Sequence, residues 1–438
     1  MPPPNPFVQN INDLWRLGDE RSPVKNTSAS IYRPEILDTI EQVITSLDDD
    51  LRRLNLDIHE HPELRFEEHR THDVLTDFMM KQGFSVTPHH LLETAWVATF
   101  THGSGGRNIG VNSEMDALPG IGHACGHNLI AMAGVAVACA VKTAMQKHDI
   151  SGTVVLLGTP AEEGGGGKAI LIDRGAYEGM DVCLMCHPAP GPPHSASLNS
   201  CLARQTIEVE FFGHTAHAAL SPWEGQNALD AAVLAYTNIS VLRQQLKPSH
   251  RVHGIFEGKD WTPNIIPDYA KMTWYVRAPT RAEMMATVKR VMACFQAAAL
   301  ATGCKIEPHL KGAVLDLRQN EALEDEFGAI FENRYGPVDY AYGIGSASTD
   351  FGNVTYALPS LHPGYGIPTE KDGGNHTPAF TSAAKTIEAH NATLDVSKTL
   401  AAIGVRILAD DQFFAKVRKT FEKDCQLRDE EARQVDST

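Results

Sequence analysis

The chain has 438 residues, of which 42% are hydrophobic and 21% are charged, and these proportions are ordinary for a globular protein. This length predicts at least two domains that together bury a large core. The formal net charge is −16, and no run of Lys and Arg offsets it, which argues against nucleic acid and anionic membranes as partners.

The cysteines and the first residues indicate the compartment. The 8 cysteines are scattered and several fall in apolar stretches, so we read most of them as small buried residues in a reducing compartment. The opening residues, MPPPNPFVQN, lack the basic and then apolar regions of a signal peptide. We see no apolar run that approaches the ~18 residues of a membrane span. These features predict a cytoplasmic protein.

The first half of the chain predicts an α/β domain. Residues 1–33 are rich in Pro, Asn and Ser and predict an N-terminal arm. Over residues 34–203, apolar residues at helical spacing alternate with short apolar runs. We expect helices at 34–64, 67–83, 129–145 and 168–179, and strands at 84–90, 96–100, 108–114, 152–160 and 181–188. This alternation is typical of a mixed, mostly parallel sheet that is flanked by helices.

The pattern changes at residue 204. Up to residue 314 we expect strands at 205–213, 251–258, 270–278 and 304–312 and helices at 226–246 and 280–303. The order β-α-β-β-α-β predicts a ferredoxin-like α+β module. The α/β character resumes over 315–438, with a helix at 322–336, a strand and loop at 357–367 and a long helical stretch at 382–408. We therefore interpret the module as an insertion into one α/β domain.

Residues with metal-ligand chemistry follow three successive predicted strands. Asp116, Cys125 and His127 follow the strand at 108–114, in the Gly-rich stretch DALPGIGHACGHNL. The strand at 152–160 leads to the pair Glu162 and Glu163, and the strand at 181–188 leads to His187; His376, in GGNHTPAF, is a fourth candidate. Because ligands bind at the carboxyl ends of parallel strands, we expect these side chains to converge.

Nitrogen, oxygen and sulfur donors in one place predict a metal site, for Zn²⁺ first and for Mn²⁺, Co²⁺ or Ni²⁺ as alternatives. Consecutive side chains diverge, so Glu162 and Glu163 are not expected to bind the same ion. One of them can coordinate while the other serves as a general base for water.

Seven motifs occur in an order that carries a family resemblance over about residues 35–410. The motifs are DALPGIGHACGHNL, PAEEGGGG, MCHP, FFGHTAHAA, TPNIIPD, GSASTDFGN and NHTPAFT. They resemble the M20 metallopeptidase/amidohydrolase family, subfamily D. The resemblance implies a di-zinc peptidase-like catalytic domain that is interrupted by a lid and dimerisation domain.

The resemblance also implies the roles of individual residues. Two divalent ions would share Cys125 as a bridging thiolate, with the other ligands being His127, Glu163, His187 and His376. Glu162 would be the general base, and Asp116 would orient a ligand imidazole. Many family members outside the subfamily carry His where this chain has Glu114, which leaves the shell of the first ion open.

Three residues of the predicted module match substrate-contacting positions of the family. His217 would reach the active site of the partner subunit in a homodimer and polarise the scissile carbonyl. Asn264 and Arg277 would bind substrate oxygens, and Arg277 suits a carboxylate through bidentate pairing. The alternative reading of His217 and Arg277 is that both are solvated surface residues.

These observations predict an enzyme that cleaves the amide bond of a dipeptide or an N-acyl amino acid with a metal-activated water and Glu162 as base. Two alternatives stay open. In one, Cys125 is the nucleophile of an amidase, with His127 or His123 as its base. In the other, the protein keeps the fold but only binds its ligand. The loop around Glu370 and Asp372 borders the expected pocket and leaves the side-chain preference of the substrate open.

Overall fold

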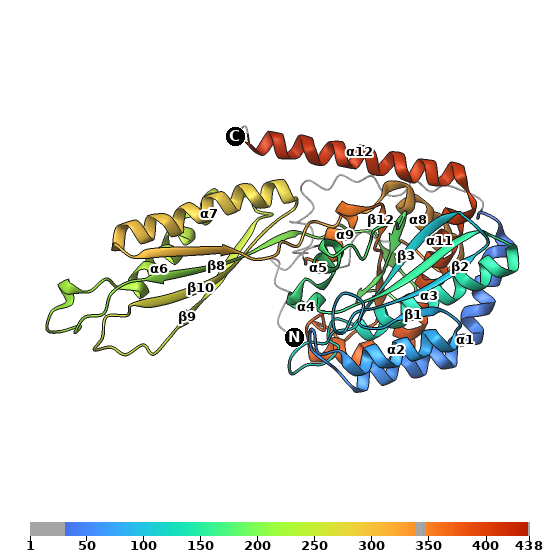
Figure 1. The fold of residues 1–438 in the computed structure, drawn as a ribbon, viewed down its shortest axis with the longest axis horizontal. Coiled ribbons are helices and arrows are strands. Elements are labelled where there is room, and N and C mark those ends of the chain that lie inside the picture. Colours follow the sequence, from blue (N-terminus) through green and yellow to red (C-terminus); the bar gives the residue numbers. More distant parts are fainter. Residues whose placement is uncertain (1–30, 339–344, 346, 437–438) are drawn as a thin grey trace, which may run out of the picture. The chain divides into compact units, whose positions relative to one another are not determined.

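The computed structural model describes residues 31–338, 345 and 347–436. Most of the predicted N-terminal arm therefore lies outside the described residues. The described chain forms two compact units (Figure 1). The larger unit comprises residues 31–200 and 317–426, and the inserted unit comprises residues 201–316 together with 427–436 at the end of the chain.

A six-stranded sheet organises the larger unit. In spatial order its strands are β1 (Ser85–Thr87), β2 (Trp96–His102), β4 (Gly152–Thr159), β3 (Arg107–Glu114), β5 (Val182–Leu184) and β12 (Ser360–Leu361). Strand β2 pairs antiparallel with β1 and β4, and the other three pairings are parallel. The predicted mixed, mostly parallel sheet is thus confirmed. A second, three-stranded sheet has the order β6 (His187–Pro190), β13 (Gly364–Ile367) and β7 (Ala196–Ser197).

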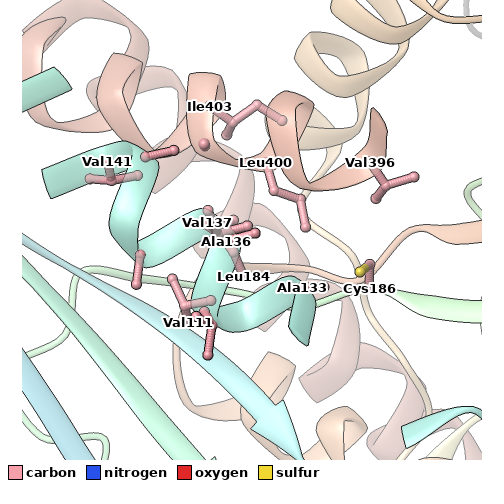
Figure 2. Packing of buried hydrophobic residues seen from close by; sticks show 14 of the residues in the cluster. Val111, Ala133, Ala136, Val137, Val141, Leu184, Cys186, Val396, Leu400 and Ile403 are labelled. Atoms are coloured by element: carbon pink, nitrogen blue, oxygen red, sulfur yellow. The ribbon is translucent and has the colours of Figure 1, made fainter. Parts of the chain in front are cut away.

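Helices α3 (His127–His148) and α11 (Ile387–Ala409) pack on this sheet, and α1 (Pro34–Glu60) packs against both helices. Figure 2 shows part of the core, in which Val137 of α3 and Leu400 of α11 cluster with Val111 of β3 and Leu184 of β5. Further helices complete the unit: α2 (His69–Lys81), α4 (Glu162–Gly165), α5 (Gly167–Asp173), α8 (Glu321–Arg334), α9 (Phe351–Ala357) and α10 (Pro378–Ala384). The last helix is α12 (Asp411–Asp436); its residues up to 426 are grouped with the larger unit and those from 427 with the inserted unit.

Two features of the C-terminal part differ from the prediction. The long helical stretch is broken into α10 and α11, because the Thr386 side chain accepts a hydrogen bond from Ala389 N and caps a new helix there. Helix α12 was not predicted, since its composition is strongly polar and only a few apolar residues, such as Phe413 and Val417, are buried.

The expectation about membrane-length segments is wrong for α3. This helix has 22 residues, and its most apolar 18-residue window has a mean hydropathy of 1.6, which makes it long and apolar enough to cross a bilayer. However, 89% of its apolar window is buried inside the protein, as in a core helix. Length and composition alone therefore do not make α3 a membrane span.

The inserted unit has the predicted β-α-β-β-α-β order. Its sheet has the order β11 (Lys305–Leu310), β8 (Ala203–Phe212), β10 (Tyr269–Ala278) and β9 (Arg251–Gly258), and all pairings are antiparallel. Helices α6 (Ala228–Leu242) and α7 (Arg281–Thr302) cover one face. Along β8, Ile207, Val209 and Phe211 point into a separate core, and the residues between them are half-buried.

Candidate metal and catalytic centre

The larger unit brings the predicted strand ends together. Strands β4, β3 and β5 are neighbours and run parallel, so their carboxyl ends lie at one edge of the sheet. Strand β3 ends at Glu114, two residues before Asp116, and β4 ends three residues before Glu162. After β5, His187 opens β6. The sheet topology therefore gathers three loops at one point, as expected.

Close backbone contacts lock these loops together. Gly126 has a φ of 78°, and a Cβ at this position would lie 2.5 Å from Pro188 Cγ, so only glycine fits. The fourth predicted loop joins through two hydrogen bonds. His376 N donates to Ala124 O at 2.8 Å, and Asn375 Nδ2 donates to Pro188 O at 3.2 Å.

The five predicted ligands form two groups that share one thiol. Cys125, His127 and His187 offer donor atoms that all lie within 4.8 Å of one another, and so do Cys125, Glu163 and His376. Cys125 Sγ lies 3.4 Å from His187 Nε2, and Glu163 Oε1 lies 3.0 Å from His376 Nε2. His127 Nε2 is buried and has no hydrogen-bond partner among the described residues. Sulfur, nitrogen and oxygen donors in this arrangement fit a pair of divalent ions.

Asp116 connects three parts of this centre. Its Oδ1 accepts hydrogen bonds from His127 Nδ1 and from Glu162 N, both at 3.1 Å, and its Oδ2 accepts one from Glu163 N at 2.8 Å. Burial alone would raise the pKa of Asp116, but His127 and the Glu163 N–H hold this pKa below its ordinary value. Because Nδ1 of His127 is engaged, Nε2 is left as the free donor atom.

Glu162 has the environment of a proton-accepting carboxylate. Its Oε2 lies 4.0 Å from His127 Nε2. Burial raises the pKa of Glu162 well above its ordinary value, and the neighbouring carboxylates of Glu114, Glu163 and Asp350 raise it further. Such a carboxylate takes up a proton readily.

The expected divergence of Glu162 and Glu163 is not found. The backbone at Glu163 is not helical, with φ −70° and ψ 68°, and carboxylate oxygens of both residues lie within 4.8 Å of each other and of His127. Both side chains therefore face the same small volume.

The environment of Cys125 argues against a nucleophilic thiolate. Burial raises the pKa of Cys125, and the carboxylate of Glu163 raises it further. His123, considered as a base for this thiol, is buried, and burial lowers its pKa to about 3. Neither His123 ring nitrogen has a hydrogen-bond partner in the described part of the chain.

The three substrate-contacting candidates all belong to the inserted unit. His217 Nδ1 accepts hydrogen bonds from Ala219 N and Leu220 N, both at 3.2 Å, so the ring proton sits on Nε2. Asn264 is held beside His217, because the backbone carbonyl of Asn264 accepts a hydrogen bond from Ala218 N at 3.0 Å. Arg277, near the end of β10, has its guanidinium 5.7 Å from the centre of the Tyr275 ring.

Three buried polar residues of the centre were missed or left open in the sequence analysis. Lys168 and Asp350 form a buried ion pair beside Glu114. A lysine directly after GGGG, and the aspartate within STDFGN, were the available signals. Neither carries metal-ligand chemistry at a predicted strand end, so neither was singled out.

Comparison with known proteins places this site in a family. Residues 110–395 match the family described as Peptidase family M20/M25/M40. A protein of Mus musculus named Xaa-Arg dipeptidase is 42% identical over 385 residues, which is 84% of this chain and 88% of that protein. One of the subunits of the p-aminobenzoyl-glutamate hydrolase of Escherichia coli is 28% identical over 431 residues, covering 81% of this chain and 88% of that protein.

Solved structures agree on the fold. A dinuclear metal binding peptidase from the M20 family of Bacillus subtilis matches with a TM-score of 0.65 at 20% identity, covering 83% of this chain and 99% of that one. The aminobenzoyl-glutamate utilization protein of Klebsiella pneumoniae matches with a TM-score of 0.62 at 19% identity, covering 81% and 98%.

The fold and the sequence matches together define an enzyme of the peptidase and amidohydrolase class. The chain belongs to peptidase family M20/M25/M40. The resemblance drawn from its motifs is thereby confirmed.

Proposed function

We propose that the protein hydrolyses the amide bond of a dipeptide or an N-acyl amino acid, with two divalent ions and Glu162 as general base. The observation that carries this proposal is the pair of donor groups sharing Cys125, with the Glu162 carboxylate beside them. All of these residues lie in the larger unit, at the carboxyl edge of its parallel strands.

The proposed ligands are His127 and His187 for one ion, Glu163 and His376 for the other, and Cys125 for both. When bound, the ions supply Lewis acidity for the scissile carbonyl and lower the pKa of a water molecule from ~16 towards ~7. A thiolate with imidazoles suits Zn²⁺, which we propose as the resident metal, with Mn²⁺, Co²⁺ and Ni²⁺ as replacements.

Glu162 accepts the proton of the attacking water and then passes it to the leaving amine. Asp116 supports this step, because it holds the backbone N–H groups of Glu162 and Glu163 as well as the ring of His127. No covalent acyl-enzyme is involved, and the place of Cys125 in both donor groups favours a ligand role over the nucleophile of the rival amidase mechanism.

A substrate panel tests the proposal. The protein is loaded with Zn²⁺, Mn²⁺ or Co²⁺ and assayed with dipeptides that end in Arg, Lys or Gly, with N-acetyl amino acids and with p-aminobenzoyl-glutamate. The panel starts from C-terminal Arg and from p-aminobenzoyl-glutamate because relatives carry these names. We expect hydrolysis that chelation abolishes and metal restores; hydrolysis that survives complete metal removal would overturn the proposal.

The Glu162→Gln variant separates the metal mechanism from its alternatives. We expect kcat to fall roughly 10²- to 10⁴-fold, because a positioned general base contributes about that factor. The metal content, measured by mass spectrometry, should equal that of the wild type. Unchanged turnover with bound metal would show that Glu162 is not the base.

We further propose that the protein is a cytoplasmic homodimer in which His217 serves the active site of the partner subunit. Supporting features are the Nε2 proton of His217, which makes it a hydrogen-bond donor for a carbonyl oxygen, and the 8 cysteines, which are all described and free of disulfides. Asn264 and Arg277 would hold the substrate oxygens.

Subunit mixing tests the role of His217 across the dimer. Equal amounts of His217→Ala and Glu162→Gln protein, each inactive alone, are unfolded and refolded together. Random pairing should restore about a quarter of the wild-type sites, because each mixed dimer has one site with both residues. A mixture that stays inactive although light scattering shows mixed dimers would exclude the exchange.

A further inference from the structure

Lys168 is a fully buried lysine beside the proposed catalytic centre. It is the second residue of α5, and its ammonium has two acidic neighbours. The Nζ atom lies 2.6 Å from Glu114 Oε1 and 2.5 Å from Asp350 Oδ1. None of the three side chains belongs to the two donor groups that share Cys125. Their burial therefore needs another explanation.

Such a cluster is costly as a purely structural device. Buried ions lose their hydration, and a buried pair is often no more stabilising than apolar residues of the same size. Here two buried carboxyl groups meet one buried ammonium, so the cluster holds more acidic groups than basic ones. A buried ionic network that contributes little stability is retained where it fixes one arrangement of the groups around it.

Glu114 connects the cluster to the proposed ligand His127. Its Oε1 contacts Lys168, and its Oε2 lies 3.3 Å from His127 Nε2. The other ring nitrogen of His127 is bound by Asp116 at 3.1 Å. A carboxylate therefore lies beside each ring nitrogen: Asp116 forms a hydrogen bond with Nδ1, whereas Glu114 approaches Nε2 without one and is itself next to the ammonium.

Asp350 connects the cluster to the loop that carries Glu162. Its Oδ2 accepts a hydrogen bond from Lys168 N at 2.9 Å, while its Oδ1 contacts the ammonium. The loop from Ala161 to Lys168 is therefore fixed at its end by Asp350, and at its start by Asp116 and by Glu68, which accepts from Ala161 N at 2.8 Å. The four glycines between these two ends would otherwise leave the position of Glu162 poorly defined.

We propose that Lys168 is a positioning residue: with Glu114 and Asp350 it orients His127 and fixes the loop that carries Glu162. This inference rests on the proposed function, because it assigns His127 to the metal and Glu162 to proton transfer. Lys168 itself contributes no atom to the two donor groups that share Cys125. The ammonium also lets Glu114, Glu162 and Asp350 approach to within 4.8 Å of one another without a further cation.

Three variants and one control test this role in the full-length protein. Lys168→Met removes the charge at nearly constant length, Asp350→Asn weakens the anchor of the loop, and Glu114→Gln weakens the contact to His127. The control is Glu326→Gln. It removes the ion pair between Glu326 Oε2 and Arg406 Nη1, which are 2.5 Å apart in the same unit, and this pair involves no residue of the centre. Each protein is loaded with Co²⁺, whose ligand-field bands report on His127 and whose charge-transfer band reports on Cys125.

We expect kcat of the three variants to fall roughly 10- to 100-fold, as for residues that orient metal ligands, while KM changes less than about threefold. Their ligand-field bands should shift while the Cys125 charge-transfer band persists. Glu326→Gln should lower the unfolding temperature but keep the wild-type kcat and spectrum.

The inference would be overturned if the Lys168→Met variant folds and has the same kcat and the same Co²⁺ ligand-field bands as the wild type. If Lys168→Met does not fold, the same outcome in Asp350→Asn and Glu114→Gln overturns it. The inference would also be overturned if Glu326→Gln lost as much kcat as Lys168→Met when both variants lose the same stability. The lower kcat would then follow from destabilisation alone. If the wild type hydrolyses none of the panel substrates, the proposed function fails, and the Co²⁺ spectra still decide whether Lys168 positions His127.

Discussion

At the scale of single residues, one carboxylate serves several purposes. Asp116 binds the ring of His127 and two consecutive backbone N–H groups of the Glu162–Glu163 loop. An oriented ligand imidazole and an oriented base therefore depend on the same side chain. The low pKa of Asp116 keeps it ionised, so that it accepts all three hydrogen bonds.

The Asp116→Asn variant should weaken the centre without unfolding the protein. An amide has only one acceptor oxygen, so at least one of the three hydrogen bonds is lost. We expect Zn²⁺ affinity to fall about 10- to 100-fold, measured by competition with a chromophoric chelator.

The matched control for Asp116→Asn is Asp181→Asn, whose carboxylate accepts a hydrogen bond from Asn108 N at 2.8 Å in the same unit. The control should keep wild-type Zn²⁺ affinity. Equal affinity in the two variants would contradict the role of Asp116.

We expect Glu283 to give the inserted unit a pH-dependent stability. His250 holds the pKa of Glu283 down to about 2, with a further contribution from Lys247, although burial acts in the opposite direction. A lowered carboxyl pKa stabilises the folded state above the unfolded pKa of about 4.5, and this stability is lost as the pH falls towards 2.

We expect Glu283→Gln to lower the free energy of unfolding by about 1–2 kcal/mol near neutral pH, a value reduced for partial exposure. The difference from the wild type should shrink by about half or more near pH 3. Urea unfolding at the two pH values measures it, with exposed Glu307→Gln as the control. A difference that does not depend on pH would rule out the ion pair as its source.

At the scale of elements, the contact between α3 and β3 leaves no room for a side chain. A Cβ at Gly134 of α3 would lie 2.2 Å from Ser113 Oγ and 2.8 Å from Asn112 O of β3. The helix that begins with His127 therefore packs directly on the strand that ends at Glu114. This contact sets the distance between the sheet and His127, the proposed metal ligand at the start of α3.

Gly134→Val should destabilise the larger unit by about 1–3 kcal/mol or more, because it overpacks this contact. Gln146→Val introduces the same residue on the exposed face of α3 and should cost less than about 0.7 kcal/mol, the difference in helix propensity. The unfolding temperatures of the metal-free Gly134→Val and Gln146→Val proteins measure the two effects. Similar unfolding temperatures would show that α3 shifts to accommodate the side chain.

Elements with strong patterns were predictable, and elements defined by local capping were not. Buried strands such as β3 and β4 read as apolar runs, and their parallel pairing followed from the alternation with helices. The break before α11 depends on one side-chain hydrogen bond of Thr386, and the helical pattern continues across it. The polar helix α12 lacks the broad apolar stripe on which the prediction relied.

At the scale of the whole molecule, the two units differ in how the chain builds them. The four strands and two helices of the inserted unit come from one continuous segment and enclose their own core. The larger unit combines residues from both sides of this segment. Its strand β12 pairs in parallel with β5, although the whole insertion separates them in the sequence.

We expect residues 201–316 to fold when produced alone. The segment should show cooperative thermal unfolding by circular dichroism, because its sheet and both helices pack on one core. If the proposed dimer forms through this unit, analytical ultracentrifugation should show a dimer of the isolated segment. Broad, non-cooperative unfolding would contradict an independent unit.

The candidate centre was predictable to the extent that its chemistry lies at strand ends. The topology of a parallel sheet predicted that Cys125, Glu163 and His187 converge at one edge. The cluster of Lys168 and Asp350 was not predictable, since a lysine after a Gly-rich loop and a distant aspartate reveal no contact. The path of the backbone at Glu163 also depends on dihedral angles that residue types do not specify.

The order of the donors along the chain has a consequence for synthesis on the ribosome. Cys125, His127 and His187 are all translated before the inserted unit, whereas His376 is translated after it. At the usual elongation rate, the first donor group exists for roughly ten to forty seconds before His376 emerges. In that interval the second donor group already has Cys125 and Glu163 and lacks only His376. The second donor group is therefore complete only after the inserted unit has been synthesised.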